Sequence, residues 1–379
     1  MQYRVTVLTP LLVGDGRELS PVDYMVWKDQ VNVLDQTRIF KLLARGPRLE
    51  GYLTQLRKAT KLDFASWGGF AQNFSQRRIP FESTDSTVIW NAASSENLFI
   101  PTFTAGHRGA YLPGSALKGA LRTGLVFSRW NDDLLDRLEK TIEGDRLPRR
   151  VAESAENSSG ASQVRVVAAA DSDSVPTSAF KIYLTRVASL DTRSGAKPQL
   201  VWKVAGRGSV PSQRMTESTA LFAEMAVPGT TFTGDWREKK FLENPELTHA
   251  LGWRSVPDPQ MLFAGAHKYA AAQLNIHAAY AQTSGLSRVS QTVERLRAEL
   301  TAVQESQTSC LLCLGWGGGF LSKAAVLNTE RESYRNILKA VPAISRSIRD
   351  GLTFPKTRRV VFSGGQPATL PGWVRLEFS

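Results

Sequence analysis

Four glycines within five residues follow an apolar run near the end of the chain, and this pattern restricts the local fold more than any other. The run Leu311-Leu312-Cys313-Leu314 predicts a buried strand, and Gly315-Trp316-Gly317-Gly318-Gly319 then removes almost every Cβ from the turn that follows. Such a turn can adopt positive φ angles and lets another backbone come close. With Lys323 just beyond it, the segment suits either a phosphate-binding loop or a tight turn that the structure requires.

This glycine run matches neither of the common nucleotide-binding loops. A Walker A loop needs a glycine and a lysine at the fifth and sixth positions after its first glycine, but Phe320 stands five positions after Gly315. The dinucleotide fingerprint Gly-x-Gly-x-x-Gly fails at the same phenylalanine. We therefore expect no nucleotide cofactor, and the sequence predicts no other cofactor.

The charge balance of the chain points to a polyanionic partner. Lysine and arginine total 47 against 35 acidic residues, for a formal net charge of +12 over 379 residues. This excess favours a nucleic acid, an acidic protein or an anionic membrane surface. A membrane-spanning helix is not expected, because no apolar run reaches 18 residues. The first residues alternate like a strand and lack a signal peptide's apolar core, so we expect a cytoplasmic protein with no membrane partner.

The residues that commonly hold metals do not form a recognisable set. Cys310 and Cys313 are the only two cysteines, so the second pair of a structural zinc site is missing. Asp15, Asp23 and Asp35 are spread over a predicted turn and hairpin, where turn and cap roles account for them. The sequence predicts buried free thiols and no metal site.

A second notable segment is a predicted helix with a basic face. Pro113-Gly114 ends the preceding segment, and Ser115 is a suitable N-cap for a helix that runs to about Trp130. Lys118, Arg122 and Arg129 then fall within roughly 40° of one another around the axis. Residues 101–130 hold four basic side chains and no acid. Both an anion site at the helix N-terminus and an ordinary amphipathic surface helix fit this pattern.

Strands and helices alternate within each half of the chain, which predicts an α+β fold. We expect strands at residues 2–8, 180–190 and 220–227, and helices at residues 263–282 and 287–306. Residues 64–104 are expected to be irregular with short strands, and residues 150–179 to be mostly a mobile insertion, with residues 164–167 as a candidate short strand. A boundary near residues 210–218 would give two domains, 1–215 and 216–379, the second carrying the glycine-rich loop.

Three segments together resemble the RAMP superfamily, the repeat-associated RNA-binding proteins of CRISPR systems. They are the opening Thr9-Pro10-Leu11-Leu12-Val13-Gly14-Asp15-Gly16, the helix start Pro113-Gly114-Ser115-Ala116-Leu117-Lys118-Gly119-Ala120-Leu121-Arg122, and the glycine run at 315–319. The chain is further similar to the fifth subunits of Csm-type (type III-A) effector complexes in three segments: Asp23-Tyr24, the segment GWGGGFLSK at 315–323, and the closing segment PKTRR…LPGWVRL.

The resemblance implies two ferredoxin-like, RRM-related domains with insertions. It implies a subunit that binds the 3′ region of CRISPR RNA and caps a filament of backbone RAMP subunits, with a role in guide maturation or assembly and antiviral defence. Its partners would be the guide RNA and other Csm subunits, especially the backbone RAMP subunit, with target RNA as a further candidate. The implied RNA-binding residues are Gly114, Ser115, Lys118, Arg122, Gly315, Trp316, Gly317, Gly318, Gly319 and Lys323, with His107 and Arg108 as weaker candidates.

The sequence also departs from the RNA-binding pattern of RRM domains. No Arg/Lys-Gly-Phe-Gly-Phe run is present, so contacts to the sugar–phosphate backbone are favoured over base reading. Catalysis is not expected, although a RAMP endoribonuclease with His107 as general acid or base stays an alternative. Another RAMP subunit of a type III complex and a pure protein–protein adaptor are the remaining alternatives.

Overall fold

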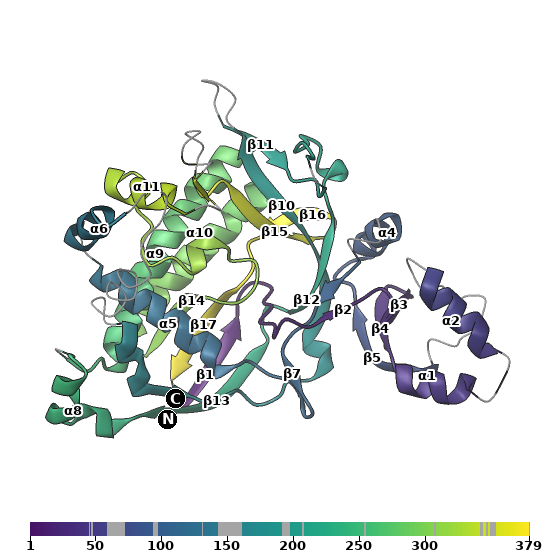
Figure 1. Ribbon diagram of the computed structural model, residues 1–379, viewed down its shortest axis with the longest axis horizontal. Coiled ribbons are helices and arrows are strands. Elements are labelled where there is room, and N and C mark those ends of the chain that lie inside the picture. The colour runs from purple at the N-terminus through teal and green to yellow at the C-terminus, as the bar shows by residue number, and fades with distance from the viewer. Residues whose placement is uncertain are drawn as a thin grey trace.

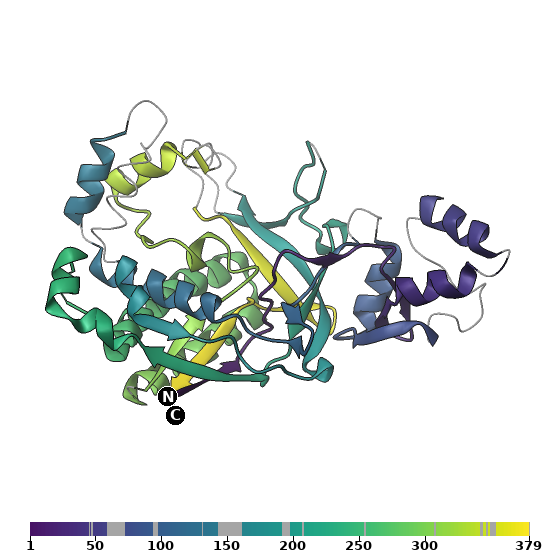
Figure 2. The ribbon, with the colours of Figure 1, turned by 60° about the horizontal axis from the view of Figure 1, so that its bottom comes forward.

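The computed structural model describes residues 1–44, 46, 48–58, 73–93, 98–130, 132–142, 161–191, 198–206, 208–253, 255–306, 308–341, 344–345, 348 and 354–378. Most of the chain forms a body of two antiparallel sheets with long helices packed beside them (Figure 1). A smaller lobe built from the first hundred residues projects from one side of this body (Figure 2). These layers confirm the expected mixture of helix and sheet.

The first sheet has the strand order β14-β17-β1-β13-β9. Its strands are β1 (Gln2–Val7), β9 (Val167–Ala169), β13 (Thr231–Glu238), β14 (Ser309–Cys313) and β17 (Trp373–Phe378). Strand β1 lies at the centre, and every second side chain of it (Tyr3, Val5 and Val7) points into the core. Because β1 pairs antiparallel with β17, the two ends of the chain lie side by side (Figure 1).

The second sheet is organised around one long strand. Strand β10 (Phe180–Asp191) pairs along one edge with β12 (Leu221–Ala226) and β11 (Gln199–Trp202), and along the other with β15 (Thr357–Ser363). Strand β16 (Gln366–Thr369) extends the sheet beyond β15. Each large sheet takes strands from both sides of residue 215. The expected division at that residue therefore does not coincide with the division between the sheets.

Helices pack against the first sheet. They are α5 (Gly114–Arg129), α9 (Pro259–Ser284) and α10 (Ser287–Ser306), with α6 (Asp132–Glu139), α8 (Pro245–Ala250) and α11 (Glu332–Lys339) at the periphery. Helices α5 and α9 cross closely because glycines meet there. A Cβ at Gly124 would lie 2.9 Å from the Ala266 backbone. Short 3-10 turns occur at η3 (Ala161–Val166), η4 (Thr177–Ala179), η5 (Met215–Glu217), η6 (Lys240–Glu243) and η7 (Phe320–Ser322).

The small lobe has its own hydrophobic cluster, built by a three-stranded sheet and two helices. Its elements are β3 (Tyr24–Trp27), β4 (Gln30–Leu34), β5 (Ser75–Pro80), α1 (Gln36–Leu43) and α2 (Arg48–Lys58), next to α4 (Thr84–Ala92). Asp35 caps α1, since its carboxylate accepts a hydrogen bond from the Arg38 amide. The short pair β2 (Glu18–Leu19) with β6 (Ile100–Pro101) lies between the lobe and the body, and the hairpin β7 (Ala105–Gly106) with β8 (Gly109–Ala110) contacts Val175 of the body.

The two segments expected to be irregular are more ordered than predicted where the structure describes them. Residues 64–104 contain the expected short strands, β5 and β6, but also helix α4, whose Trp90 is buried against the rest of the protein. Residues 161–179 are not a loose insertion, since Val164, Val166 and Val167 are buried and β9 pairs with β13. The candidate strand at 164–167 is a 3-10 turn up to Val166, and β9 begins at Val167. Residues 150–160, the first part of the expected insertion, lie outside the described residues. Within the described part of the chain, no helix is long and apolar enough to cross a membrane.

Candidate nucleic-acid interface

The segment after β1 is held in place by backbone hydrogen bonds from several elements. Thr9 accepts a hydrogen bond from the Trp373 amide at 3.0 Å, and the carbonyl of Pro10 accepts one from Gly372 at 3.0 Å. Leu11 exchanges two backbone hydrogen bonds with Ala226. The Thr-Pro pair at the start of this motif therefore fastens the first strand to the last one.

The glycine-rich loop packs directly against this segment. The Trp316 amide donates to the Leu12 carbonyl at 2.8 Å. Gly315 has a φ of +72°, and a Cβ there would overlap the Leu12 carbonyl oxygen. Gly317 has a φ of +93°, and a Cβ there would lie 2.6 Å from Cγ of Pro371. Since only glycine fits both the backbone angle and the space at these two positions, the loop is a structurally required turn.

Helix α9 fixes the far end of the loop. The Tyr269 hydroxyl donates to the Ala324 carbonyl at 2.8 Å, and the Gln273 amide donates to the Leu321 carbonyl at 2.7 Å. Burial raises the pKa of Tyr269, so the hydroxyl stays a donor at any physiological pH. Lys323 lies between these anchored carbonyls and is exposed.

Helix α5 supplies the third wall. Its buried face consists of Leu117, Leu121, Gly124 and Leu125, and the neighbouring face with Gly119, Ala120 and Thr123 borders an open space. Ala116 and Ala120 belong to this neighbouring face. Both residues contact the core, yet they are half-buried and line that space.

These three segments enclose one cleft of about 670 Å³. Residues 12–17 form one side, α5 the second, and the glycine-rich loop the third. Among the sequence-predicted site residues, Arg122, Gly315, Trp316 and Lys323 line it. Arg17 and Glu18 also line it, and Arg17 is paired with Asp15 at 3.3 Å. Small residues and backbone make up much of the wall, which lets an extended chain lie close to it.

The N-terminus of α5 is not arranged as the sequence indicated. The helix begins at Gly114 and has no side-chain cap from Ser115. The Gly114 amide instead donates to the Asp171 carboxylate at 2.9 Å, so an acid of this chain occupies the position expected for a phosphate. A Cβ at Gly114 would overlap the Ala169 carbonyl, which explains the glycine by packing.

The three residues of the expected basic face of α5 do not all lie on the same side of the helix. Lys118 does not line the cleft and lies near Lys239 and Arg165. Burial lowers the pKa of Lys118, and these two cations lower it further. Arg129 hydrogen bonds to Gln163 in η3. Only Arg122 of the three expected side chains reaches the cleft.

The weaker candidates His107 and Arg108 lie at the exposed tip of the β7–β8 hairpin and do not line the cleft. The other three histidines do not line it either. His267 contacts the Ser309 carbonyl, and His277 accepts a hydrogen bond from the buried Arg358. Cys310 and Cys313 are buried free thiols, as predicted, and burial raises the pKa of both. Gly317, Gly318 and Gly319 shape the loop without lining the cleft.

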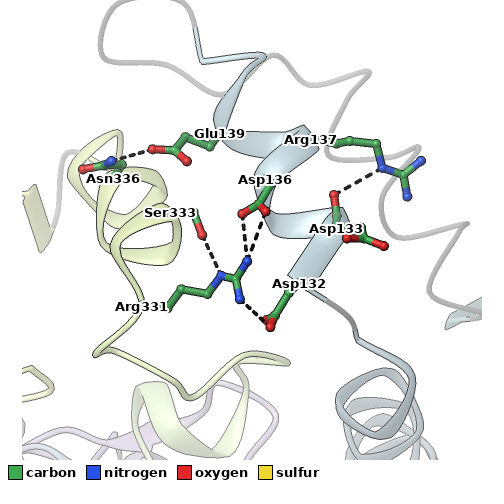
Figure 3. Close-up of polar contacts among 8 residues, drawn as sticks. All are labelled: Asp132, Asp133, Asp136, Arg137, Glu139, Arg331, Ser333 and Asn336. Atoms are coloured by element: carbon green, nitrogen blue, oxygen red, sulfur yellow. Dashed lines mark hydrogen bonds and ion pairs between the residues drawn. The ribbon is translucent and has the colours of Figure 1, made fainter.

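Beyond the cleft, α6 and α11 continue from α5 and from the loop, and polar contacts join them (Figure 3). The Arg331 guanidinium donates to both oxygens of Asp136, at 3.0 and 3.1 Å, and also pairs with Asp132. The hydrogen bond from Arg331 lowers the pKa of Asp136. This bridge ties the segment after the glycine-rich loop to the segment after α5.

A larger cavity of about 1190 Å³ lies between α10 and strands β15 and β16. It contains Glu82, Glu294, Arg288 and Arg295, and of the three motifs it includes only the Thr9-Pro10 pair. Because its charges are mixed and the motifs lie elsewhere, we take the smaller cleft as the candidate interface.

The fold and the cleft define a class of protein: an α+β scaffold in which a glycine-rich loop closes against the segment after the first strand. The chain belongs to the RAMP superfamily, whose model matches residues 4–241. This finding confirms the family expected from the three motifs.

Comparisons with individual proteins agree with this assignment. A curated relative, the "CRISPR system Cms protein Csm5" of Methanocaldococcus jannaschii, is 22% identical over 153 residues, and the match spans 37% of this chain and 33% of the relative. A chain in the cryo-EM structure of a Csm-crRNA-target RNA ternary complex of a type III-A CRISPR-Cas system superposes with a TM-score of 0.65 at 20% identity, covering 100% of both chains. The crystal structure of T. onnurineus Csm5 superposes with a TM-score of 0.59 at 17% identity, covering 98% of this chain and 99% of the other. The chain is thus similar to Csm5 over its whole length in fold.

Proposed function

We propose that this chain is an RNA-binding structural subunit of a type III-A CRISPR effector complex and that it holds the 3′ region of the guide RNA. The observation that carries the proposal is the convergence of three distant motifs on one cleft that Arg17, Arg122 and Lys323 line. The superposition with a chain of a Csm-crRNA-target RNA complex supports the same assignment. We further infer that the two sheets correspond to two ferredoxin-like units and that the subunit caps one end of the backbone filament.

The chemistry of the cleft favours binding over cleavage. Arg122 and Lys323 can neutralise phosphates, and the glycine and alanine wall lets a sugar–phosphate chain approach. General acid–base cleavage needs a group such as histidine at the bound phosphate, and each of the four histidines lies elsewhere. We therefore propose a guide-holding role without catalysis. A ribonuclease that uses His107 would be revealed by cleavage of repeat RNA that the His107→Ala variant lacks.

Binding of single-stranded RNA to the purified chain at several salt concentrations tests this function. We expect the double variant Arg122→Ala/Lys323→Ala to bind more weakly across unrelated RNA sequences and to show a shallower dependence of log K on log salt. The matched control Lys268→Ala/Arg297→Ala removes the same charge from α9 and α10 at positions that do not line the cleft. Equal losses in both double variants would show that only net charge matters and would refute the assignment of the cleft.

A further inference from the structure

The aromatic ring of the glycine-rich loop has a cation packed against it. The guanidinium carbon of Arg359 lies 3.9 Å from the centroid of the Trp316 ring, well within the range of a cation–π contact. Trp316 is half-buried, contacts the main hydrophobic core, and lines the cleft. The ring is thus supported from within the protein and borders the space in which we place the RNA.

Arg359 is held in position from β15. Its guanidinium donates to the Thr185 hydroxyl of β10 at 3.4 Å, and its side-chain stem passes beneath Gly317, where a Cβ would lie 3.3 Å from Cδ of Arg359. Burial lowers the pKa of Arg359 to about 10, so the group still carries its charge at neutral pH. Among the described residues no carboxylate pairs with Arg359. Its contacts go to a hydroxyl and to the face of the indole.

The backbone of Trp316 is equally constrained. Its amide donates to the Leu12 carbonyl, and the glycines on either side hold positive φ angles that other residues adopt only under strain. A ring fixed from its backbone and from one face loses little conformational freedom on binding a ligand. This arrangement exceeds what a tight turn requires, because glycine at 315 and 317 already makes the turn.

We propose that Trp316 is a stacking platform for one nucleobase of a single-stranded RNA and that Arg359 is a positioning residue that holds the ring. The inference rests on the proposed function and adds a base contact to a site otherwise suited to phosphates. Every base has an aromatic face, so such a platform tolerates any guide sequence. The positive charge of the guanidinium on one face also makes the indole a better partner for an electron-rich base.

The test uses the purified full chain and fluorescent single-stranded RNAs of about 12 nucleotides, within the usual site size, in which one abasic nucleotide is moved along the strand. One position should weaken binding by about 5- to 150-fold, the range that stacking of one base supports. Trp316→Leu should lose a similar factor, become insensitive to that abasic position, and keep the wild-type salt slope because no phosphate contact is lost. Trp316→Phe, which keeps a ring and a similar shape, should fall between the two.

Arg359→Met tests the positioning role, because methionine keeps much of the bulk and removes the guanidinium. We expect a smaller penalty at the same abasic position and partial recovery in Arg359→Lys. The control Trp27→Leu removes an exposed tryptophan of the small lobe that does not line the cleft, and it should bind as wild type does.

Two outcomes overturn the proposal separately from the proposed function. Wild-type protein that binds RNA yet shows no abasic-sensitive position has no stacking site, and this result needs no variant that could misfold. Trp316→Phe or Trp316→Leu that keeps the full abasic penalty would place the stacking residue elsewhere. Wild-type protein that binds no RNA at any salt concentration would overturn the stacking site and the proposed function together.

Discussion

The buried ion pair between Arg77 and Glu224 allows a quantitative prediction about how the small lobe is held on the body. Glu224 on β12 is fully buried, and its two carboxylate oxygens accept hydrogen bonds from both terminal nitrogens of Arg77 on β5, at 2.7 and 2.9 Å. The amide of Phe103, next to a residue that lines the cleft, also points at this carboxylate at 3.4 Å. Arg77→Met leaves Glu224 buried without its counter-charge, and removing one partner of such a pair costs about 3–5 kcal/mol.

The cost should depend on pH in a defined direction. Burial raises the pKa of Glu224 above its ordinary value of 4.5, and Arg77 acts against that rise. A raised folded-state pKa means that the stability contributed by the group is fully present below pH 4.5 and is lost as pH rises through the folded-state pKa. Without Arg77 the pKa rises further, so the deficit of Arg77→Met relative to wild type should be small near pH 4.5 and largest above neutrality.

Denaturant unfolding between pH 5 and 8, with amide hydrogen exchange of Ser75–Pro80, measures this effect. Arg78→Met on the exposed face of the same strand is the matched control and should change stability far less. The double variant Arg77→Met/Glu224→Gln should regain part of the loss and show no such pH dependence. The reasoning is refuted if Arg77→Met is as stable as Arg78→Met at pH 8, or if its deficit is the same at pH 5 and pH 8.

Three further predictions follow from other contacts. Gly315→Ala should destabilise the protein by about 2–5 kcal/mol, because the new Cβ both strains the backbone and overlaps the Leu12 carbonyl. In Gly319→Ala the new Cβ lies in open space, so only the backbone strain remains and the cost should be about 1–3 kcal/mol. Denaturant midpoints of the two variants test this difference. Burial is the main reason that the pKa of His277 lies well below 6.5 in the folded protein. As pH drops below 6.5, the unfolded chain binds a proton at this residue before the folded protein does, so the stability should fall. His277→Gln should flatten this part of the pH–stability curve. Arg331→Ala should increase the hydrogen exchange of α11 relative to wild type at neutral pH but not at a pH low enough to protonate Asp136. The pKa of Asp136 is lowered, so the stability that this pair contributes disappears as pH falls. An equal increase relative to wild type at both pH values would refute this prediction.

The sequence predicted the elements whose residues carry a strong local pattern. Strand β1, helices α9 and α10, and the cap at Asp35 lie where expected, because alternation, helical period and capping depend on near neighbours. Helix α4 was not expected, and residues 161–179 were misjudged, since α4 and β9 are stabilised by partners more than fifty residues away: Tyr24 contacts Trp90 of α4, and β13 pairs with β9. No local pattern records such partners.

The candidate site shows the same division. The sequence by itself determined the turn at 315–319, the presence of a helix that ends near Trp130 and the basic balance of the chain, because these follow from the absence of Cβ atoms, from helical period and from composition. Only the tertiary structure decided that Arg122 faces the cleft and Lys118 does not, that Asp171 occupies the start of α5, and that Arg359 lies against Trp316. Each of these contacts joins residues that are distant in sequence, and their positions are fixed by the packing of two sheets and not by the chain around them.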